Sequence, residues 1–306
     1  MPAIDERTCV KGRVLRVHGL TSVIAGEDGR QYRCAVRRLL RTLSTDERNI
    51  VTTGDIVWVR PDQAGEGLIE RVEPRHGILS RASRKREHVI VANVDQIVIV
   101  GSLKEPLLKP HLIDRYLASA CQGGMAPVIC LNKADLVDVA HYQPQVGLYS
   151  QLGIPTLFTS AVTGAGVGRL RELLRDRQTV FAGQSGVGKS SLLNAIQPGL
   201  GLEVREVSEV NQKGKHTTTT AQLIALVSGG WVVDTPGIRQ FRLWDIIPEE
   251  VEGFFPEFSP YVPLCAYPDC THTHEDRCAI KRGVAMHEIS VQRYTSYLGM
   301  FSGEQP

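Results

Sequence analysis

The sequence lacks any long apolar segment. None of its hydrophobic runs approaches the roughly 20 residues that a membrane-spanning helix requires. The first residues, MPAIDERTCVKGR, lack the apolar core of a secretion signal, so we expect a cytoplasmic protein without a membrane partner. Internal repeats and low-complexity stretches are also missing. The 306 residues are enough for two or three globular domains.

Cysteine is scarce, and its distribution argues against a disulfide framework. The chain has seven cysteines and no export signal, which favours free thiols or metal ligands. Net charge is small as well, at +2. However, residues 1–86 hold 17 Lys/Arg against 11 Asp/Glu, whereas the rest of the chain holds 18 against 22. The basic part predicts either a polyanion-binding region or a solvated surface.

Short strands and turns predict an all-β domain over residues 1–76. Apolar and polar residues alternate in KGRVLRVHG (11–19), TSVIAGEDGRQYRCAV (21–36), GDIVWVRP (54–61) and GLIERVEPR (67–75), and EDGR indicates a hairpin. Five or so strands in this length favour a small barrel, with an OB-fold as the first choice. We expect the basic segment VRRLLRTLSTDERN (36–49) to be partly helical.

Residues 77–245 alternate apolar strands with helical stretches, which predicts a parallel α/β domain. The apolar runs are VDQIVIVGS, APVICLNKAD, IPTLFTSA, QTVFAGQSG and GGWVVDTPG, and each ends in polar residues or glycine. Ligands of such sheets bind at the carboxyl ends of the strands. The remaining residues, 246–306, show little periodicity before GVAMHEISVQRYTSYLGM (283–300), which we predict to be a closing helix.

A phosphate-loop motif lies between one of these strands and a helix. The stretch GQSGVGKS fits the pattern GxxxxGK[ST], in which glycines let backbone N–H groups turn toward phosphates. Lys189 would contact the β- and γ-phosphates, and the Ser190 hydroxyl would bind Mg²⁺. The residues assigned to nucleotide binding here are Gly183, Gln184, Ser185, Gly186, Val187, Gly188, Lys189, Ser190 and Ser191.

Two other strands end in motifs that predict guanine binding. NKAD follows one of them, and TSA follows the next strand along the chain. Asp135 can accept the N1–H and N2 amino protons of guanine, whereas adenine would leave this carboxylate unpaired. The residues assigned to the base site are Asn132, Lys133, Asp135, Ser160 and Ala161.

DTPG (234–237) is a further nucleotide motif at a strand end. Asp234 would hold Mg²⁺ through water, and the Gly237 N–H would contact the γ-phosphate. Upstream, KGKHTTTT (213–220) offers a threonine that would bind Mg²⁺ in the GTP state. Four consecutive threonines prevent a clear choice, and the spacing to Asp234 favours Thr218.

The order of these motifs indicates a circular permutation. Along the chain they run NKAD, TSA, GQSGVGKS, HTTTT and DTPG, whereas the phosphate loop comes first in familiar GTPases. A cut between DTPG and NKxD, with the natural ends joined, produces this order and leaves the sheet unchanged. The segment after DTPG then runs directly into the C-terminal residues, so that nucleotide state can act on them.

The C-terminal cysteines predict a metal site. Cys265, Cys270 and Cys278 lie with two histidines within fourteen residues, and four such ligands suit a closed, structural, tetrahedral Zn²⁺ site. We favour His272 as the fourth ligand, with His274 as its competitor. Buried free thiols are the alternative, which the polar, proline-containing surroundings disfavour.

Together these features resemble the ribosome small-subunit-dependent GTPase A family (RsgA, also called YjeQ) over nearly the whole chain. Matching stretches are ANVDQIVIV, LIDRYL, LNKADL, GQSGVGKSSLLNA, GKHTTT, DTPGIRQF and CTHTHEDRCA. The resemblance implies a late factor in 30S ribosomal subunit assembly that binds the subunit and its 16S rRNA through the barrel and zinc domains. It also implies zinc binding by Cys265, Cys270, His272 and Cys278.

Catalysis requires a group other than the glutamine that many GTPases place after DxxG. Ile238 holds that position and cannot polarise water. His216, just before the threonines, is the best candidate within the chain to orient or activate water. The alternative is that His216 only helps the loop to grip RNA, while the ribosome or a cation supplies the rest.

We therefore predict a monomeric GTP hydrolase that converts GTP to GDP and phosphate and is stimulated by the small subunit. Its cofactors would be Mg²⁺ with the nucleotide and one structural Zn²⁺. The alternatives are a permuted GTPase that acts on the large subunit and a GTP-regulated RNA-binding chaperone. A small-molecule kinase is disfavoured, because NKAD and TSA commit the pocket to guanine.

Overall fold

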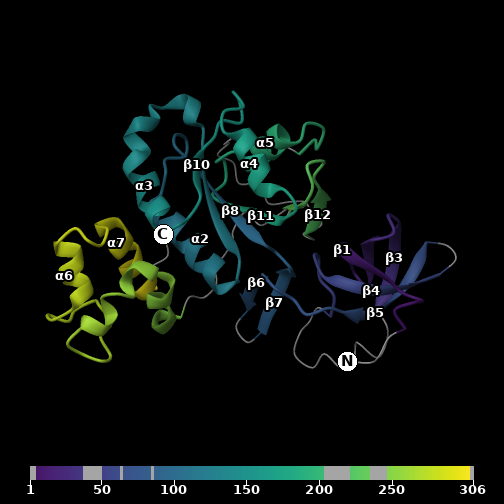
Figure 1. Ribbon diagram of the computed structural model, residues 1–306, viewed down its shortest axis with the longest axis horizontal. Helices are drawn as coiled ribbons and strands as arrows, with labels where there is room; N and C mark the ends of the chain where they lie inside the picture. Colours follow the sequence, from purple (N-terminus) through teal and green to yellow (C-terminus); the bar gives the residue numbers. More distant parts are fainter. Residues whose placement is uncertain are drawn as a thin grey trace, which may run out of the picture.

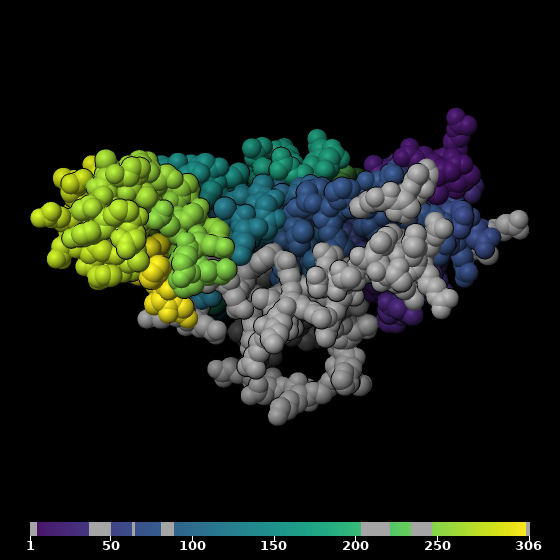
Figure 2. All heavy atoms as spheres, turned by 90° about the horizontal axis from the view of Figure 1, so that it is seen from below, coloured from purple at the N-terminus to yellow at the C-terminus, as the bar shows by residue number. Residues whose placement is uncertain are grey.

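A computed structural model describes residues 5–36, 50–62, 65–83, 86–202, 221–234 and 247–303. These residues form a barrel, a central sheet with helices on both faces, and a helical module. The barrel lies at one end of the molecule and residues 247–303, here called the C-terminal module, lie at the other (Figure 1, Figure 2). Among the described helices, none is long and apolar enough to cross a membrane.

Five strands close the N-terminal barrel. They are β1 (Val10–His18), β2 (Thr21–Gly26), β3 (Gln31–Val36), β4 (Ile56–Pro61) and β5 (Glu66–Val72). Their order is β1-β2-β3-β5-β4, and β4 pairs back with β1. Only β3 and β5 pair in parallel among them. This topology confirms the predicted OB-like barrel, although residues 37–49 of the predicted basic loop lie outside the described part of the chain.

The central sheet is parallel except at one edge. Its strands are β8 (Gln96–Ser102), β9 (Ala126–Asn132), β10 (Thr156–Phe158), β11 (Gln178–Ala182), β12 (Gln222–Ala225) and β13 (Trp231–Asp234). They follow the order β10-β9-β8-β11-β13-β12, in which only β12 is antiparallel to its neighbour. The five predicted apolar runs thus form five parallel strands, as expected.

Helices cover both faces of this sheet (Figure 1). α2 (Pro110–Gln122) and α3 (Gln143–Gln151) pack on one face, and α4 (Val167–Leu174) and α5 (Lys189–Ile196) pack on the other. Successive side chains of a strand point to opposite faces, so Ile97 and Ile99 pack in the first core. Val98 and Val100 pack in the second core. The strand is buried on both sides, and this explains its nearly continuous apolar sequence.

Two connections that the sequence did not predict join the barrel to the sheet. β6 (Leu79–Ser83) and β7 (Arg86–Val91) form a hairpin between the barrel and β8. β1 also pairs with β12, through Arg16 and Gln222, so barrel and central strands share one sheet. The domain boundaries after residues 76 and 245 stay predictions.

The C-terminal module consists of short helices, and the predicted closing helix is present as the last of them, but it begins at residue 291 and not at residue 283. Three 3₁₀ helices, η3 (Pro248–Phe254), η4 (Pro256–Phe258) and η5 (Val262–Leu264), precede α6 (Ala279–Ala285) and α7 (Val291–Phe301). His287 has a left-handed φ of 60° after α6, and the Ser290 hydroxyl accepts the Arg293 N–H at the start of α7. The left-handed residue follows the end of α6 and the serine cap starts α7, although the apolar spacing of the sequence continues through both helices.

Candidate nucleotide and metal sites

The phosphate-loop motif occupies the turn between β11 and α5. α5 begins at Lys189, and Gly188 precedes it with a φ of 94°. Gly183 has a φ of 141°, and a Cβ added there would lie 2.2 Å from the Val100 carbonyl oxygen, so glycine is required. Lys189 Nζ donates to the carbonyl oxygens of Gly183 and Gln184 at 2.7 and 2.6 Å. The ammonium group therefore lies within the loop, where helix N–H groups also favour an anion.

The other residues of this loop surround that position. Val187 is buried, Ser185 is exposed, and Ser190 and Ser191 lie half-buried in the first turn of α5. The first-turn N–H groups of a helix have no partner within the helix. The loop and the helix start thus combine a lysine, serine hydroxyls and backbone donors at one end of the sheet.

Asn132 connects the separate motifs. It is 2% exposed at the end of β9, and its Nδ2 donates to the Val187 carbonyl oxygen at 2.9 Å. Its Oδ1 accepts from Thr159 Oγ1 at 3.3 Å. One side chain therefore contacts the phosphate loop and the TSA stretch, which lie far apart in the sequence. The predicted convergence of NKAD, TSA and GQSGVGKS is present in the structure.

The remaining base-site residues lie in the loops after β9 and β10. Lys133 has a left-handed φ of 63°, and its Nζ donates to the Glu105 carbonyl oxygen. Asp135 is exposed in the 3₁₀ turn η1 (Ala134–Leu136). Ser160 is buried, and its hydroxyl accepts the Thr163 N–H at 3.1 Å, while Ala161 is half-buried. The Ser160 hydroxyl thus supports its own loop, and Asp135 is accessible to a ligand.

The third motif begins beside the phosphate loop. Asp234 ends β13, which pairs in parallel with β11, so both strand ends lie at the same edge. The side chain of Asp234 lies outside the described part of the structure, as do Gly237, Thr218 and His216. The Mg²⁺ ligands predicted from this motif and the predicted catalytic residue therefore stay predictions.

Tyr116 is a contact of the phosphate loop that the motifs did not reveal. It lies on α2, 8% exposed, and the backbone of Gly183 hydrogen-bonds to its hydroxyl group. Burial raises the pKa of Tyr116 above its ordinary value. Tyr116, Ile113 and Leu108 line a pocket with Gln184 between α2 and the loop. The stretch LIDRYL marks this residue in the sequence, but no local pattern indicates its partner.

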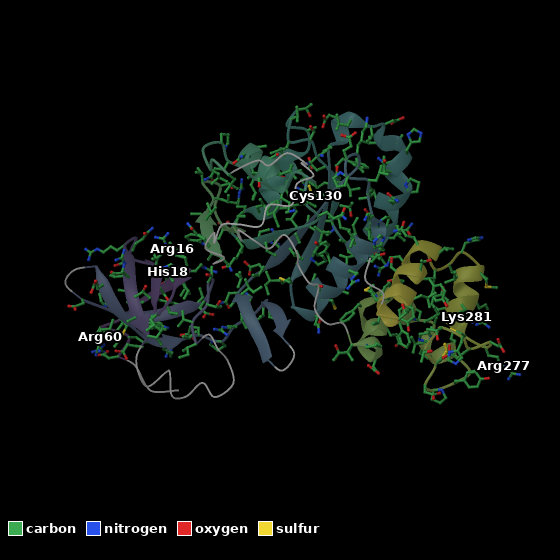
Figure 3. The ribbon with its side chains drawn as sticks, turned by 180° about the vertical axis from the view of Figure 1, so that it is seen from behind. Arg16, His18, Arg60, Cys130, Arg277 and Lys281 are labelled. Atoms are coloured by element: carbon green, nitrogen blue, oxygen red, sulfur yellow. The ribbon has the colours of Figure 1, made fainter. Side chains whose placement is uncertain are left out.

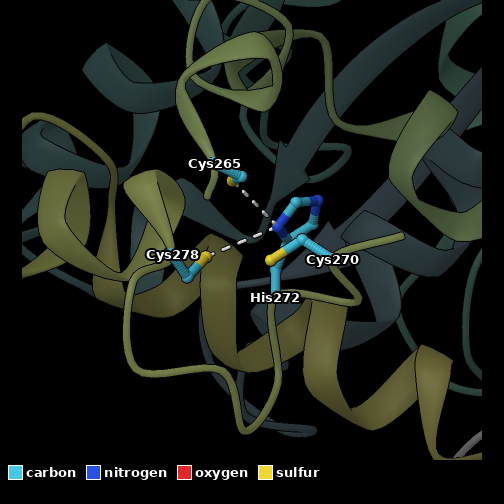
Figure 4. A group of neighbouring side chains, drawn as sticks. All are labelled: Cys265, Cys270, His272 and Cys278. Atoms are coloured by element: carbon cyan, nitrogen blue, oxygen red, sulfur yellow. Dashed lines mark hydrogen bonds between the residues drawn. The ribbon is translucent and has the colours of Figure 1, made fainter. Parts of the chain in front are cut away.

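The three C-terminal cysteines and His272 form one cluster (Figure 4). One ligand atom from each of Cys265, Cys270, His272 and Cys278 lies within 4.8 Å of all the others. His272 Nδ1 is 3.6 Å from Cys265 Sγ and 3.4 Å from Cys278 Sγ. The His272 side chain is 1% exposed, whereas the side chain of His274 is 82% exposed and lies outside the cluster. The structure therefore places His272, the preferred residue, in the cluster with the three cysteines and leaves its competitor His274 outside it.

The spacing of the donor atoms fits a tetrahedral zinc ion. Zn–S bonds of about 2.3 Å and Zn–N bonds of about 2.0 Å place sulfur and nitrogen about 3.5 Å apart. The two sulfur–nitrogen distances from His272 match that separation. Burial raises the pKa of Cys270 to about 12 and also raises the pKa of Cys278. Zinc binds thiolates, so metal binding at these cysteines releases protons.

The contacts around His272 also hold its loop. Tyr294 Oη donates to the His272 carbonyl oxygen and Tyr297 Oη donates to the Thr271 carbonyl oxygen, both at 2.7 Å. His272 Nε2, on the ring edge away from the sulfurs, lies 2.8 Å from Glu252 Oε2. Glu252 is a second residue that the motifs did not reveal, because it lies on η3, outside the cysteine-rich stretch.

Comparison with known proteins gives matches over nearly the full length. The sequence profile of the RsgA GTPase family matches residues 72–244. "Small ribosomal subunit biogenesis GTPase RsgA" of Bacteroides fragilis is 37% identical over 302 residues, which cover 97% of each chain. The protein of the same name from Moorella thermoacetica is 42% identical over 289 residues, which cover 94% of this chain and 95% of the relative.

Two solved structures share the fold. The crystal structure of YjeQ from Thermotoga maritima matches with a TM-score of 0.81 and 36% identity, over 96% of this chain and 98% of the other. YloQ, described as a circularly permuted GTPase, matches with a TM-score of 0.75 and 28% identity, over 100% and 99%. These matches support the permuted order of motifs that the sequence indicated.

Proposed function

The chain belongs to the RsgA GTPase family, and from this premise we propose that it hydrolyses GTP during the assembly of the small ribosomal subunit. The observation that carries this proposal is the contact of Asn132 with the phosphate loop and with Thr159. This contact joins the predicted base site to the predicted phosphate site. The printed names of the full-length relatives supply the cellular process.

Each nucleotide contact is assigned to a motif residue. Lys189, which already occupies the phosphate loop, would bind the β- and γ-phosphates, together with N–H groups of residues 183–191. Asp135 would accept protons of guanine, with Asn132 and Lys133 holding its loop and with Ser160 and Ala161 beside it. The exposed position of Asp135 leaves its carboxylate open to the base.

Magnesium would bind between the phosphate loop and the neighbouring strand end. Ser190, Asp234 and Thr218 are the proposed ligands, and oxygen donors of this kind suit Mg²⁺. The pairing of β11 with β13 supports this assignment, because it places residues 190 and 234 near the same edge. When bound, the ion neutralises charge on the phosphates. The Gly237 N–H would meet the γ-phosphate.

We assign the catalytic role to His216, because Ile238 cannot orient water. The histidine would position or activate the attacking water once the partner orders its loop. Intrinsic turnover would then be slow, and hydrolysis would report that the small subunit is bound.

The barrel and the C-terminal module are the proposed surfaces for the small subunit and its 16S rRNA. Arg16, His18 and Arg60 lie on the barrel, and Arg277 and Lys281 lie on the module at the opposite end (Figure 3). The excess of Lys/Arg in residues 1–86 favours contact with phosphates, so affinity should fall as salt rises. We propose that the protein is a cytoplasmic monomer. Residues 1–76 at one end and residues 246–306 at the other would both contact the small subunit.

The cluster of Cys265, Cys270, His272 and Cys278 would bind one Zn²⁺. Four protein ligands leave no open position, so the ion would stabilise the module and take no part in hydrolysis.

The decisive experiment is GTP hydrolysis by the purified chain alone, with small subunits and with large subunits at matched concentration. Stimulation by the small subunit alone is the expected result. Stimulation by the large subunit alone would instead assign the chain to that subunit, and stimulation by neither would contradict the ribosomal role.

A Lys189→Ala variant tests the role of the nucleotide. It should lose GTP binding and hydrolysis, whereas Lys281→Ala, on the surface of the module, should retain the basal rate. If Lys189→Ala still supported subunit assembly fully, the chain would be an RNA-binding chaperone. His216→Ala should lose the stimulated rate and keep nucleotide binding.

A further inference from the structure

The two ring nitrogens of His272 face different partners. Nδ1 points toward the sulfurs of Cys265 and Cys278, at 3.6 and 3.4 Å (Figure 4). Nε2, on the other edge of the ring, lies 2.8 Å from Glu252 Oε2. A neutral imidazole has one N–H donor and one lone pair, and a carboxylate only accepts. The contact with Glu252 therefore requires the proton on Nε2 and leaves the lone pair on Nδ1.

Packing holds the imidazole in place, and a buried neighbour holds the backbone that carries Glu252, whose own side chain is 40% exposed. The His272 side chain is 1% exposed, and the rings of Phe258 and Tyr297 lie with centroids 6.4 and 6.2 Å from its own. Glu252 follows Val251, whose side chain is fully buried and anchors η3. The imidazole thus has little freedom to turn, and the carboxylate is presented by a fixed backbone.

We propose that Glu252 is a positioning residue of the metal centre, which accepts the Nε2–H of His272 and thereby directs Nδ1 at the metal. This inference rests on the proposed zinc site. Such carboxylate–histidine–metal arrangements fix the tautomer and raise the basicity of the ligand nitrogen. Glu252 does not belong to the four-residue cluster, since it lies on the ring edge away from the sulfurs.

The contact also joins two parts of the C-terminal module. η3 is the first described element after β13, which ends at Asp234. The contact between Glu252 and His272 connects η3 with the loop of residues 265–278, which carries all four cluster residues. Metal binding therefore fixes the point at which the chain enters the module.

Zinc affinity measures the effect directly. The full chain, stripped of metal, would be titrated with Zn²⁺ against a coloured chelator, for the wild type, Glu252→Ala, Glu252→Gln and Glu250→Gln. Loss of an outer-sphere partner typically weakens metal binding by about 10–100-fold, and we expect this for Glu252→Ala. Glu252→Gln keeps an accepting oxygen without the charge and should lie between. Glu250, which is exposed on the same 3₁₀ helix, is the matched control and should bind zinc like the wild type.

The tautomer gives a second readout, which general loss of stability would not change. Long-range ¹H–¹⁵N NMR of the zinc-loaded chain should show His272 with metal on Nδ1 and with a slowly exchanging proton on Nε2. In Glu252→Ala that proton should exchange faster, while in Glu250→Gln it should not. Metal on Nε2 in the wild type would overturn the proposal.

The zinc site and the role of Glu252 can be disproved separately. If the wild type bound no zinc, the zinc site itself would be wrong, and the role of Glu252 would fall with it. If the wild type bound zinc and Glu252→Ala bound it equally well, only the role of Glu252 would be wrong.

Discussion

The barrel meets the central sheet through several separate hydrogen bonds of backbone and side-chain groups, whereas the C-terminal module meets helix α2 through one cluster of buried charged side chains. At the barrel junction, β1 pairs with β12, and the Ala92 N–H donates to the Thr53 carbonyl oxygen at 2.9 Å. Thr53 Oγ1 adds a hydrogen bond to the Ala221 carbonyl oxygen at 2.9 Å. The hydrogen bonds of this junction are spread over several residues, so no single side chain holds it alone.

At the other junction, one arginine holds two elements together. Arg293 of α7 is 2% exposed, and its Nη1 donates to Asp114 Oδ1 of α2 at 2.8 Å. Its Nε donates to Glu257 Oε1 at 2.6 Å, and its guanidinium lies 4.3 Å from the centre of the Phe255 ring. Burial raises the pKa of Asp114, against the opposing effect of Arg293 and of the hydroxyl of Ser296. The stability of this junction depends on a few charged groups, each of which is compensated by the others.

The difference indicates that the two ends of the molecule respond differently to damage. A sheet junction weakens gradually as single hydrogen bonds are removed. A buried ion pair fails abruptly, because the remaining charge has no water to solvate it.

Removal of metal should unfold the C-terminal module and leave the barrel junction intact. Structural zinc contributes on the order of 10 kcal/mol to folding in small zinc-binding peptides. Hydrogen exchange followed by mass spectrometry, with and without a chelator, should show loss of protection in residues 262–301. Peptides from β1 and β12 should keep their protection, and equal loss at both junctions would contradict the contrast.

Arg293→Met should be the most destabilising single substitution at the module junction. It leaves the Asp114 and Glu257 carboxylates without their cation, and loss of one partner of a buried pair costs about 3–5 kcal/mol. The free energy of unfolding of the metal-loaded chain measures this cost by denaturant titration.

An exposed ion pair provides the control for that substitution. Arg169 Nη1 lies 2.9 Å from Glu172 Oε2, but both side chains are more than half exposed. Arg169→Met should cost at most about 1 kcal/mol. Equal costs for Arg169→Met and Arg293→Met would show that the buried cluster has no special role.

The sequence was sufficient for features that depend on local spacing and on strand direction. The phosphate loop and NKAD each follow an apolar strand, and parallel strands bring their carboxyl ends to one edge. The contact between Asn132 and Val187 is the result. The order of the motifs alone indicated the permutation, because a permuted chain leaves the sheet unchanged.

Other features depended on contacts between distant segments. The spacing of the cysteines allows His272 or His274, and burial against Phe258 and Tyr297 distinguishes them only in the folded chain. The pairing of Asp114 with Arg293 and the contact of Tyr116 with Gly183 join residues that no local pattern relates. The break between α6 and α7 cannot be read from the apolar spacing, which continues past the cap at Ser290.

Gln178→Met should weaken the barrel junction moderately. Gln178 is 1% exposed, its Nε2 donates to the Ala92 carbonyl oxygen at 2.8 Å, and its Oε1 accepts from Arg13 Nη1. The loss of both bonds, one of them to a charged group, should cost about 2–3 kcal/mol. Denaturant unfolding checks this value. Gln197→Met removes an amide that makes two backbone hydrogen bonds at the surface and should cost less; the reverse ranking would contradict the prediction.

Thr53→Val should give the smallest effect, because it keeps the shape of the side chain and the backbone contacts of the junction. It removes the hydrogen bond to the Ala221 carbonyl oxygen, and a neutral hydrogen bond of this kind contributes about 1 kcal/mol. Thr21→Val removes a similar bond to the His18 carbonyl oxygen at an exposed site, where water replaces it, and should be nearly neutral. If Thr53→Val cost as much as Arg293→Met, the barrel junction would also depend on a single side chain, and the contrast between the two ends of the molecule would be wrong.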